Sequence, residues 1–203
     1  MKVADVTALP LRERKRALTR EAILAAAERL FGERGFGNVT VAEIADAANV
    51  SVKTLFVYFR SKEDLVFTDT RLFDVCLAAL TERAPGTSPG EAIARALITV
   101  LREGEHTVGE GIEGFHRGYG GSAALHSRLL RMWEEYEDQI TAALAAEAGT
   151  APTPAMRLQA VALTAIPRSL TSPEVRAAIA GLSPADSLAY VCDWLLAAGQ
   201  ATG

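Results

Sequence analysis

Apolar residues in the first part of the chain recur at the spacing of a helix rather than that of a strand. In the segment TREAILAAAERLFGERGFG, which starts at Thr19, four of them fall on one helical face, and glycines follow directly. This pattern predicts a first helix of about four turns that ends at the glycines. The four residues on the face are Ile23, Ala27, Leu30 and Phe31.

Two short helices are predicted next. Thr40 and Glu43 have the spacing of a capping box, in which each side chain accepts a hydrogen bond from the other residue's backbone amide. This predicts a helix of two turns, and Ser51 can cap another that ends near Phe59. Because helices this short are unstable alone in water, we expect them to pack with the first helix as a helix-turn-helix unit.

The rest of the chain continues the helical pattern. Ser61 and Asp64 form a second candidate capping box, which predicts a long helix reaching Leu80. Further on, a hydroxyl residue is followed directly by proline four times, a combination typical of a helix start. No alternating strand pattern of useful length is present, so we predict an all-α fold of about nine helices. The four start signals are Ser88-Pro89, Thr153-Pro154, Ser172-Pro173 and Ser183-Pro184.

Two features depart from this regular pattern. Residues 104–121 contain seven of the sixteen glycines, which predicts a short or broken helix within a mobile connection. Pro167 is predicted to kink the eighth helix or to end it early, because proline removes a backbone donor.

Charge is distributed unevenly between the two parts of the chain. Residues 1–62 hold eleven Lys and Arg against seven Asp and Glu, a net charge of +4, whereas residues 63–203 carry −8. A basic N-terminal part on an acidic remainder is expected of a module that meets a polyanion. We therefore predict an N-terminal helix-turn-helix domain over 1–62 and a second, helical domain over 63–203.

The sequence shows no signal for a membrane or for export. No apolar run approaches twenty residues, which predicts no membrane span. The N-terminus becomes more basic where the apolar part of a signal peptide would begin, so we expect a cytoplasmic protein. Cys76 and Cys192 lack C-x-x-C spacing and are predicted to be reduced core residues.

The segment SVKTLFVYFRSKEDL, residues 51–65, has two interpretations. Its aromatic residues could be plain core, the commoner case for such a run. If instead Leu55 and Phe59 point inward, a mixed polar and aromatic outer face remains, as a helix that enters the DNA major groove requires. The short, basic setting favours the second interpretation, with Leu65 also inside.

The run from Ile23 to Leu65 closely resembles the N-terminal DNA-binding domain of TetR/AcrR-type transcriptional regulators. The residues that carry the resemblance are LFGERGF, then TVAEIA, then ANVS with TLF, YF and SKEDL. More loosely, FVYFRSKEDLVF and SAALHSRLLRMWEEYED resemble the branch that contains regulators of the mycofactocin system.

The resemblance implies a function and its partners. It implies a ligand-responsive regulator, neither an enzyme nor dependent on a cofactor, that binds a palindromic operator in double-stranded DNA as a homodimer. Repression relieved by a hydrophobic or amphipathic small molecule is the common case in the family. If the branch is right, an acyl-CoA is a plausible effector.

The resemblance also assigns roles to DNA-contacting positions. Thr40 and Lys62 would contact phosphates, Lys53 and Thr54 base edges, and Tyr58 the DNA backbone. Val52 departs from the polar residue often found there, which puts direct base reading at that position in doubt. The full expected set is Thr40, Ser51, Val52, Lys53, Thr54, Phe56, Tyr58 and Lys62.

Four basic residues lie ahead of the first predicted helix. They could add phosphate or minor-groove contacts, or they could belong to a solvated, disordered tail. Both interpretations stay open for Arg12, Arg14, Lys15 and Arg16.

The resemblance implies that the second domain, residues 63–203, binds the effector and forms the dimer, so two further surfaces are expected there. An effector pocket is predicted from residues on the helices that surround the pocket in relatives, although methionine and aromatic residues at helical spacing are more often core. The pocket set is Phe73, Leu97, Leu101, Phe115, His116, Tyr119, Leu129, Met132, Trp133 and Tyr136. The expected dimer face is Met156, Val161, Leu188, Val191, Leu195 and Leu196.

An enzyme and a protein-interaction adaptor are the alternative classes of function. An all-α enzyme would need a convergent acid and base constellation, and none is visible in the sequence. A helical protein-interaction adaptor would use the amphipathic helices for a different partner. His106, His116 and His126 lie ten residues apart, which does not place them on one helix face, so no metal site is predicted.

Overall fold

The computed structural model describes residues 10–67, 71–104, 107–119 and 122–202. Within these ranges every regular element is helical, which confirms the all-α prediction. The chain divides into two compact units, residues 1–68, here called the head, and residues 69–203, here called the body. The predicted domain boundary after residue 62 lies a few residues before this division.

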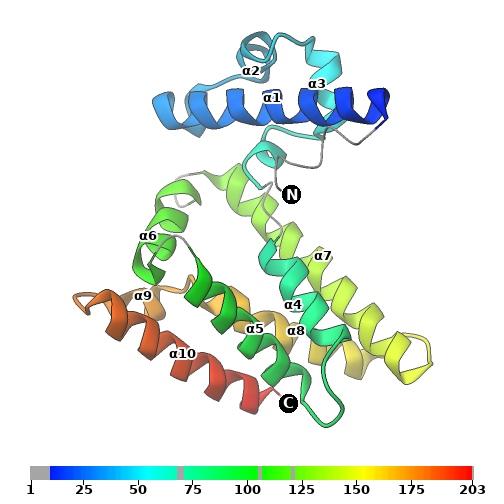
Figure 1. Cartoon of the computed structure of the whole chain (residues 1–203), viewed down its shortest axis with the longest axis vertical. Helices are drawn as coiled ribbons and strands as arrows, with labels where there is room; N and C mark the ends of the chain where they lie inside the picture. The colour runs from blue at the N-terminus through cyan, green and yellow to red at the C-terminus, as the bar shows by residue number, and fades with distance from the viewer. Residues whose placement is uncertain (1–9, 68–70, 105–106, 120–121, 203) are drawn as a thin grey trace. The chain divides into compact units, whose positions relative to one another are not determined.

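The head is a three-helix unit in which the long first helix lies across the two short ones (Figure 1). Its core consists of apolar side chains from all three helices and from the turn that follows them, among them Ile23, Ile44, Leu55, Phe59 and Leu65. Its elements are α1 (Leu11–Arg34), η2 (Phe36–Asn38), α2 (Val41–Ala47), α3 (Val52–Tyr58) and η3 (Glu63–Leu65).

Helix α1 begins eight residues earlier than the apolar pattern predicts. Its first turns carry the four basic residues at positions 12 and 14–16, so the prediction that they precede the helix is wrong. Arg, Glu, Lys, Ala and Leu, which make up this segment, are strong helix formers, and Glu13 in the first turn interacts favourably with the helix dipole. The four basic side chains are exposed.

The turn between α2 and α3 depends on one residue in the left-handed region. Asn49 has φ of 54°, a conformation that asparagine tolerates better than most residues. The amide of Val50 donates to the Ala45 carbonyl at 2.9 Å, which closes the end of α2. Ser51 then caps α3, as predicted, by accepting a hydrogen bond from the Thr54 amide at 3.0 Å.

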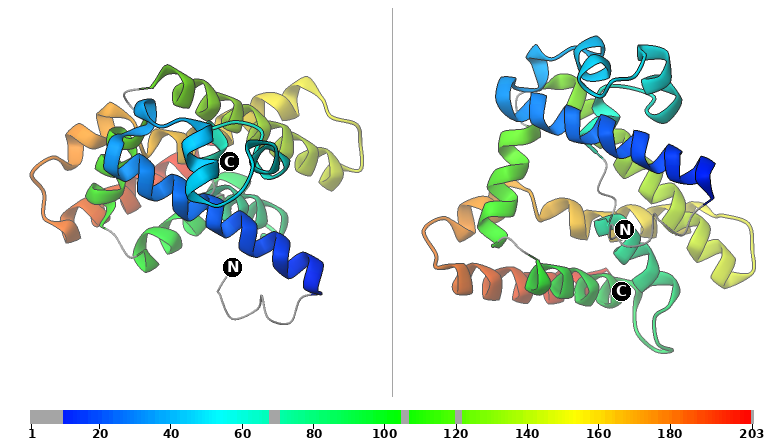
Figure 2. Two further views of the ribbon diagram at one scale, coloured as in Figure 1. Left: turned by 90° about the horizontal axis from the view of Figure 1, so that it is seen from above. Right: turned by 45° about the horizontal axis from the view of Figure 1, so that its top comes forward.

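The body is a bundle of seven helices within the described ranges. Figures 1 and 2 show α10 running beside α5, and α8 lies against α7. The elements are α4 (Arg71–Thr81), α5 (Pro89–Glu103), α6 (Val108–Tyr119), α7 (Ala123–Ala148), α8 (Pro154–Ser169), α9 (Pro173–Ile179) and α10 (Pro184–Ala201).

All four predicted hydroxyl-proline helix starts are confirmed. In each case the hydroxyl accepts a hydrogen bond from the amide three residues later, at 3.2 or 3.3 Å, and proline occupies the first helical position. These starts are those of α5, α8, α9 and α10.

The long helix predicted from Ser61 to Leu80 is wrong. The chain forms the short turn η3 instead, and α4 begins only at Arg71. The Ser61 hydroxyl does accept a hydrogen bond from the Asp64 amide at 3.3 Å, but the Asp64 carboxylate accepts one from the Arg60 amide at 3.1 Å. A capping box needs the Asp64 carboxylate to accept from the Ser61 amide, and here it accepts from the Arg60 amide instead. Only the Ser61 side of the predicted capping box therefore forms.

The glycine-rich segment is more regular than predicted. Residues 108–119 form α6, an unbroken helix of twelve residues, and residues 105–106 and 120–121 on either side of it lie outside the described ranges, so the predicted mobility of the connection stays a prediction. The Glu110 carboxylate accepts hydrogen bonds from the Thr107 amide and hydroxyl, both at 2.9 Å, and this caps the start of the helix. Val108 and Ile112, one turn apart, are buried in the body core, and this packing offsets the poor helix propensity of the glycines.

Helix α8 contains Pro167 and ends two residues after it, at Ser169. The predicted early end is therefore close to the observed one. The proline is buried in the body, so the last turn of α8 packs inward.

Helices α5 and α10 cross at two glycines. A Cβ atom added at Gly199 would lie 2.7 Å from the Gly90 carbonyl oxygen, and one added at Gly90 would lie 2.4 Å from the Gly199 carbonyl oxygen. Real Cβ atoms do not approach backbone this closely, so the crossing requires glycine on both helices. It fixes α10 against the body core.

Candidate functional site

The exposed face of α3 combines apolar and polar side chains. Val52, Phe56 and Val57 are 40%, 49% and 69% exposed, whereas Leu55 is fully buried and Phe59 nearly so. This confirms the predicted orientation of the helix, with Leu55, Phe59 and Leu65 inside. Three large apolar residues exposed on a seven-residue helix form a surface suited to contact with another molecule.

Polar groups border this apolar surface. Lys53 is exposed, and Thr54 and Tyr58 are half-buried. The hydroxyls of Ser51 and Thr54 lie 2.8 Å apart and hydrogen-bond to each other, which positions both at the start of α3. The structure thus brings together on one short helix the residues predicted for base contact.

Thr40 is already engaged by the predicted capping box. Its amide and hydroxyl donate to one carboxylate oxygen of Glu43, at 2.8 and 2.7 Å, and the other oxygen pairs with Arg34 at 2.8 Å. The pKa of Glu43 is lowered to about 2, first because its carboxylate accepts the Thr40 backbone hydrogen bond. Contact of Thr40 with a phosphate would therefore compete with a carboxylate that stays ionised.

Lys62 has a role inside the head that the sequence did not predict. Its ammonium donates to the carbonyl oxygens of Phe36 and Val39, at 2.8 and 3.0 Å, and lies 4.0 Å from the centre of the Phe36 ring. These contacts join the end of the helix-turn-helix to the link between α1 and α2. Two of the three N–H donors of the ammonium are thus used within the protein. The predicted contact of Lys62 with a DNA phosphate would have to share the ammonium with these two carbonyl groups.

Several predicted effector residues form an aromatic cluster in the body. Phe73 lies with its ring centre 5.0 Å from that of Trp133 and 5.1 Å from that of Tyr136. The Tyr136 hydroxyl is buried beside the Cys76 thiol and has no hydrogen-bond partner of good geometry among the described residues. Burial raises the pKa of the Cys76 thiol to about 12, so this cysteine stays protonated at neutral pH.

The other predicted pocket residues fall into two groups. Leu97 and Met132 are buried, and Leu101 and Leu129 pack at the edge of the core. Phe115, His116 and Tyr119 lie on α6, but their side chains are outside the described residues. The described members of the set thus pack as core, and their role in an effector pocket stays a prediction.

The predicted dimer residues divide between core and surface. Val191 and Leu195 are fully buried in the body core, because this face of α10 packs on α5, so they do not point outward. Met156 and Leu188 are half-buried against the same core. Val161 on α8 and Leu196 on α10 are exposed, as are two residues absent from the predicted set, Leu158 and Tyr190.

Two pockets in the body lie away from the aromatic cluster of Phe73, Trp133 and Tyr136. One, of about 750 Å³, is lined by α6, α9 and the start of α10, and the other, of about 580 Å³, lies beside the α4–α5 link and α7. Neither is lined by a member of the predicted effector set whose side chain the structure describes. The pairs of charged residues at these pockets, Glu113 with Arg176 and Arg83 with Glu147, are more than sixty positions apart, so no local motif could have indicated them.

Two features are absent from the described part of the chain. There, no group of three or more His, Cys, Asp and Glu side chains is placed to hold a metal ion. No helix in those ranges is long and apolar enough to cross a membrane. His106 and the side chain of His116 lie outside the described residues.

Comparison with known sequences gives two matches. Residues 23–68 match the sequence model of the bacterial regulatory proteins of the tetR family. The HTH-type transcriptional regulator TcmR of Streptomyces glaucescens is 35% identical over 128 residues, which is 61% of this chain. The match spans about half of that relative, 51% of its length.

Solved structures share the fold. A TetR-family regulator from Mesorhizobium loti matches 92% of this chain and 95% of its own, with 22% identity and a TM-score of 0.50. SmeT, solved as a complex with triclosan, matches 89% of this chain and 90% of its own, with 19% identity and a TM-score of 0.52. Residues 23–68 are thus similar to the tetR family of bacterial regulatory proteins, and the solved structures show a shared all-helical fold.

Proposed function

We propose that the protein is a transcriptional regulator that binds double-stranded DNA through α3 and responds to a small molecule held in the body. The observation that carries the proposal is the outer face of α3, where Val52, Phe56 and Val57 are exposed beside Lys53. A helix with this mixture, held by a helix-turn-helix unit, suits the major groove. The net charge of +4 over residues 1–62 supports an approach to DNA.

Each side chain of α3 is suited to a particular kind of contact. The ammonium of Lys53 can donate to guanine O6 and N7, and the Thr54 methyl can pack on a thymine methyl. Val52, Phe56 and Val57 offer no hydrogen bonds, so they too would contact thymine methyl groups or the sugars. We therefore expect the operator to be read partly through apolar contacts.

Lys62 takes a different part in this proposal from the one first predicted. Its two hydrogen bonds to backbone carbonyls hold the link between α1 and α2 in place, and α2 begins directly after that link. We infer that Lys62 acts mainly by maintaining the arrangement of the head, and that exposed basic residues on α1 provide phosphate contacts. Arg12 and Lys15 are candidates, since both are exposed on the first turns of α1.

The protein is proposed to act as a homodimer. The exposed apolar residues on α8 and α10, Leu158, Val161, Tyr190 and Leu196, form the candidate dimer face of the body. A symmetric dimer would place two α3 helices about one turn of DNA apart, roughly 34 to 36 Å, on a palindromic operator. Repression is the mode that we propose.

An effector would act by favouring another arrangement of the body. A ligand shifts such an equilibrium only by its difference in affinity for the two states. We propose a hydrophobic or amphipathic effector, and an acyl-CoA belongs in any screen. SmeT, whose fold this chain shares, was solved with the small molecule triclosan, which is consistent with a ligand of this kind.

Selection of binding sites from a random duplex pool tests the proposal. The full-length protein should enrich an inverted repeat with half-sites about ten base pairs apart, or a multiple of that spacing, centre to centre. Lys53→Met should reduce the enrichment while leaving the circular dichroism spectrum unchanged. Recovery of no preferred sequence, at low and at moderate salt, would contradict sequence-specific DNA binding and favour the interaction adaptor.

A further inference from the structure

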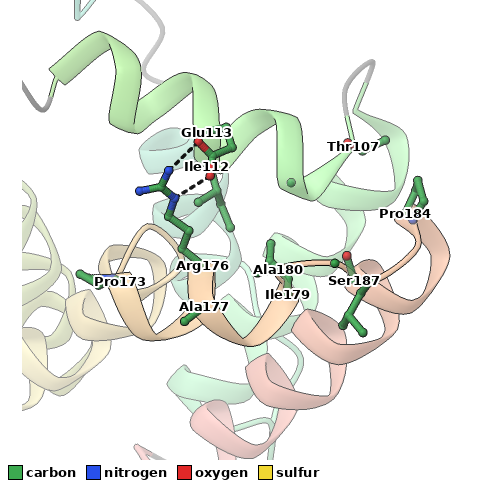
Figure 3. A pocket seen from close by; sticks show the side chains of 13 residues that line it. Thr107, Ile112, Glu113, Pro173, Arg176, Ala177, Ile179, Ala180, Pro184 and Ser187 are labelled. Atoms are coloured by element: carbon green, nitrogen blue, oxygen red, sulfur yellow. Dashed lines mark hydrogen bonds and ion pairs between the residues drawn. The ribbon is translucent and has the colours of Figure 1, made fainter.

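The larger pocket of the body has the dimensions of a small-molecule site. It has a volume of about 750 Å³ and lies between α6, α9 and the turn that leads into α10 (Figure 3). Ile112, Ile179 and Leu182 contribute apolar walls. Volumes of 300 to about 1,000 Å³ with mostly apolar walls and a few polar groups are usual for such sites.

An ion pair at one end of this pocket joins α6 to α9. Arg176 on α9 binds both carboxylate oxygens of Glu113 on α6, with Nε at 2.5 Å from one and Nη2 at 2.8 Å from the other (Figure 3). Two parallel hydrogen bonds of this kind are how arginine recognises carboxylates in general. The guanidinium is therefore already in the geometry that a carboxylate ligand requires.

The ion pair is exposed enough to be displaced. The side chains of Arg176 and Glu113 are 48% and 42% exposed, and ion pairs in such positions contribute little net stability. A carboxylate on a ligand whose apolar part is buried in the pocket has the additional free energy of that burial. Such a ligand can therefore replace Glu113 on Arg176.

A second polar group borders the pocket. Ser187 on α10 is 5% exposed and lines the pocket, so its hydroxyl is a candidate hydrogen-bond partner for a ligand. Figure 3 shows Arg176 and Ser187 on either side of a stretch formed by Ala177, Ile179 and Ala180. The arrangement suits a molecule with an anionic end and an apolar body.

We propose that this pocket binds an amphipathic carboxylate, with the ligand's carboxylate on Arg176 in place of Glu113 and its apolar part against Ile112, Ile179 and Leu182. Binding would break the ion pair between Arg176 and Glu113. Helix α6 would then lose this contact with α9. A consequence for DNA binding rests on the proposed function. Binding of the carboxylate to the pocket is independent of the proposed function, because it is measured without DNA.

The experiment uses the full-length protein and the fluorescent acid 1-pyrenebutyrate, with the matched alcohol 1-pyrenebutanol as a control for apolar binding. The acid should bind about tenfold more tightly than the alcohol, as expected for a hydrogen-bonded charge pair. Arg176→Gln should reduce the affinity for the acid to that for the alcohol. Glu113→Gln should increase it several-fold, because the competing carboxylate is removed.

A matched variant at the second pocket locates the site. Arg83 pairs with both oxygens of Glu147 at 2.6 Å and lines the 580 Å³ pocket, so Arg83→Gln removes the same chemistry elsewhere. It should leave the affinity for the acid unchanged. Equal affinities for acid and alcohol, a loss only with Arg83→Gln, or no gain with Glu113→Gln would each overturn the proposal. Circular dichroism during thermal unfolding checks that every variant is folded.

Discussion

Replacement of Lys62 by methionine distinguishes a structural role in the head from a role in DNA contact. Methionine keeps much of the apolar stem of lysine but lacks the ammonium. The variant loses the hydrogen bonds to the Phe36 and Val39 carbonyls and the contact with the Phe36 ring. If these contacts hold the head together, Lys62→Met should destabilise the head while the body stays unchanged.

The size of the effect follows from the contacts. A hydrogen bond from a charged group contributes about 1.5 kcal/mol at the lower end of the usual range, and a cation on an exposed ring about 0.5 kcal/mol. Two such bonds and one ring contact give about 3.5 kcal/mol, from which the entropy regained by the freed side chain removes about 1.5 kcal/mol. We expect a loss of about 2 kcal/mol in the stability of the head.

Hydrogen exchange followed by mass spectrometry measures this loss for each unit separately. Amides in the core of α1 to α3 should exchange about 30-fold faster in Lys62→Met, the factor that corresponds to about 2 kcal/mol. Peptides from α5 and α7 should be unaffected. Trp133 and Trp194 both lie in the body, so their fluorescence during urea unfolding gives an independent check on that unit.

Lys53→Met is the matched control. Lys53 is exposed on α3, so its loss should leave exchange in the head unchanged but weaken DNA binding. If Lys62→Met instead gives normal exchange and reduced DNA affinity, Lys62 is a DNA contact and the structural role is refuted.

Three further predictions concern packing, pH and base reading. Gly199→Ala should destabilise the body by about 2 kcal/mol in urea unfolding, because the new Cβ meets the Gly90 backbone, whereas Gly111→Ala, which has open space, should be neutral or stabilising by up to about 1 kcal/mol. Equal effects would contradict the close crossing. The pKa of Glu43 is lowered to about 2, so the ionised carboxylate stabilises the fold fully above its unfolded pKa near 4.5, and this stabilisation is lost as the pH falls towards 2. The difference in thermal stability between wild type and Glu43→Gln should therefore disappear as the pH is lowered from 4.5 to 2. A gap that is constant with pH would refute this assignment. Replacing operator thymines by deoxyuridine should weaken binding of the wild type more than that of Val57→Ala, measured by fluorescence anisotropy, and an equal loss would exclude a thymine methyl contact at that residue.

Local signals in the sequence predicted the parts of the fold that depend on local chemistry. Each helix start that was predicted correctly depends on a hydrogen bond between residues three positions apart, so the short sequence motif is enough to predict it. These starts are the capping box at Thr40, the cap at Ser51 and the four hydroxyl-proline starts. The inward positions of Leu55 and Phe59 followed from helical spacing in the same way.

Features that depend on distant contacts could not be predicted. Helix α6 is rich in glycine and is stabilised by burial of Val108 and Ile112 against other helices, which a propensity argument does not include. Lys62 finds carbonyl partners more than twenty positions away, and Arg176 pairs with a residue 63 positions away. The resemblance placed Val191 and Leu195 in a dimer face, yet both are buried in the body core, where α10 packs on α5.

Salt dependence of DNA binding by wild type and Lys53→Met tests the central claim most directly. Full-length protein is titrated by fluorescence anisotropy onto duplex DNA from beside its own gene and onto a scrambled duplex, over a range of salt concentrations. The account predicts that the logarithm of the binding constant falls linearly with the logarithm of salt for the wild type, with preference for the natural duplex, and that Lys53→Met loses about tenfold in affinity and part of that preference. A binding constant that does not change with salt, or equal affinity for the two duplexes, would contradict it.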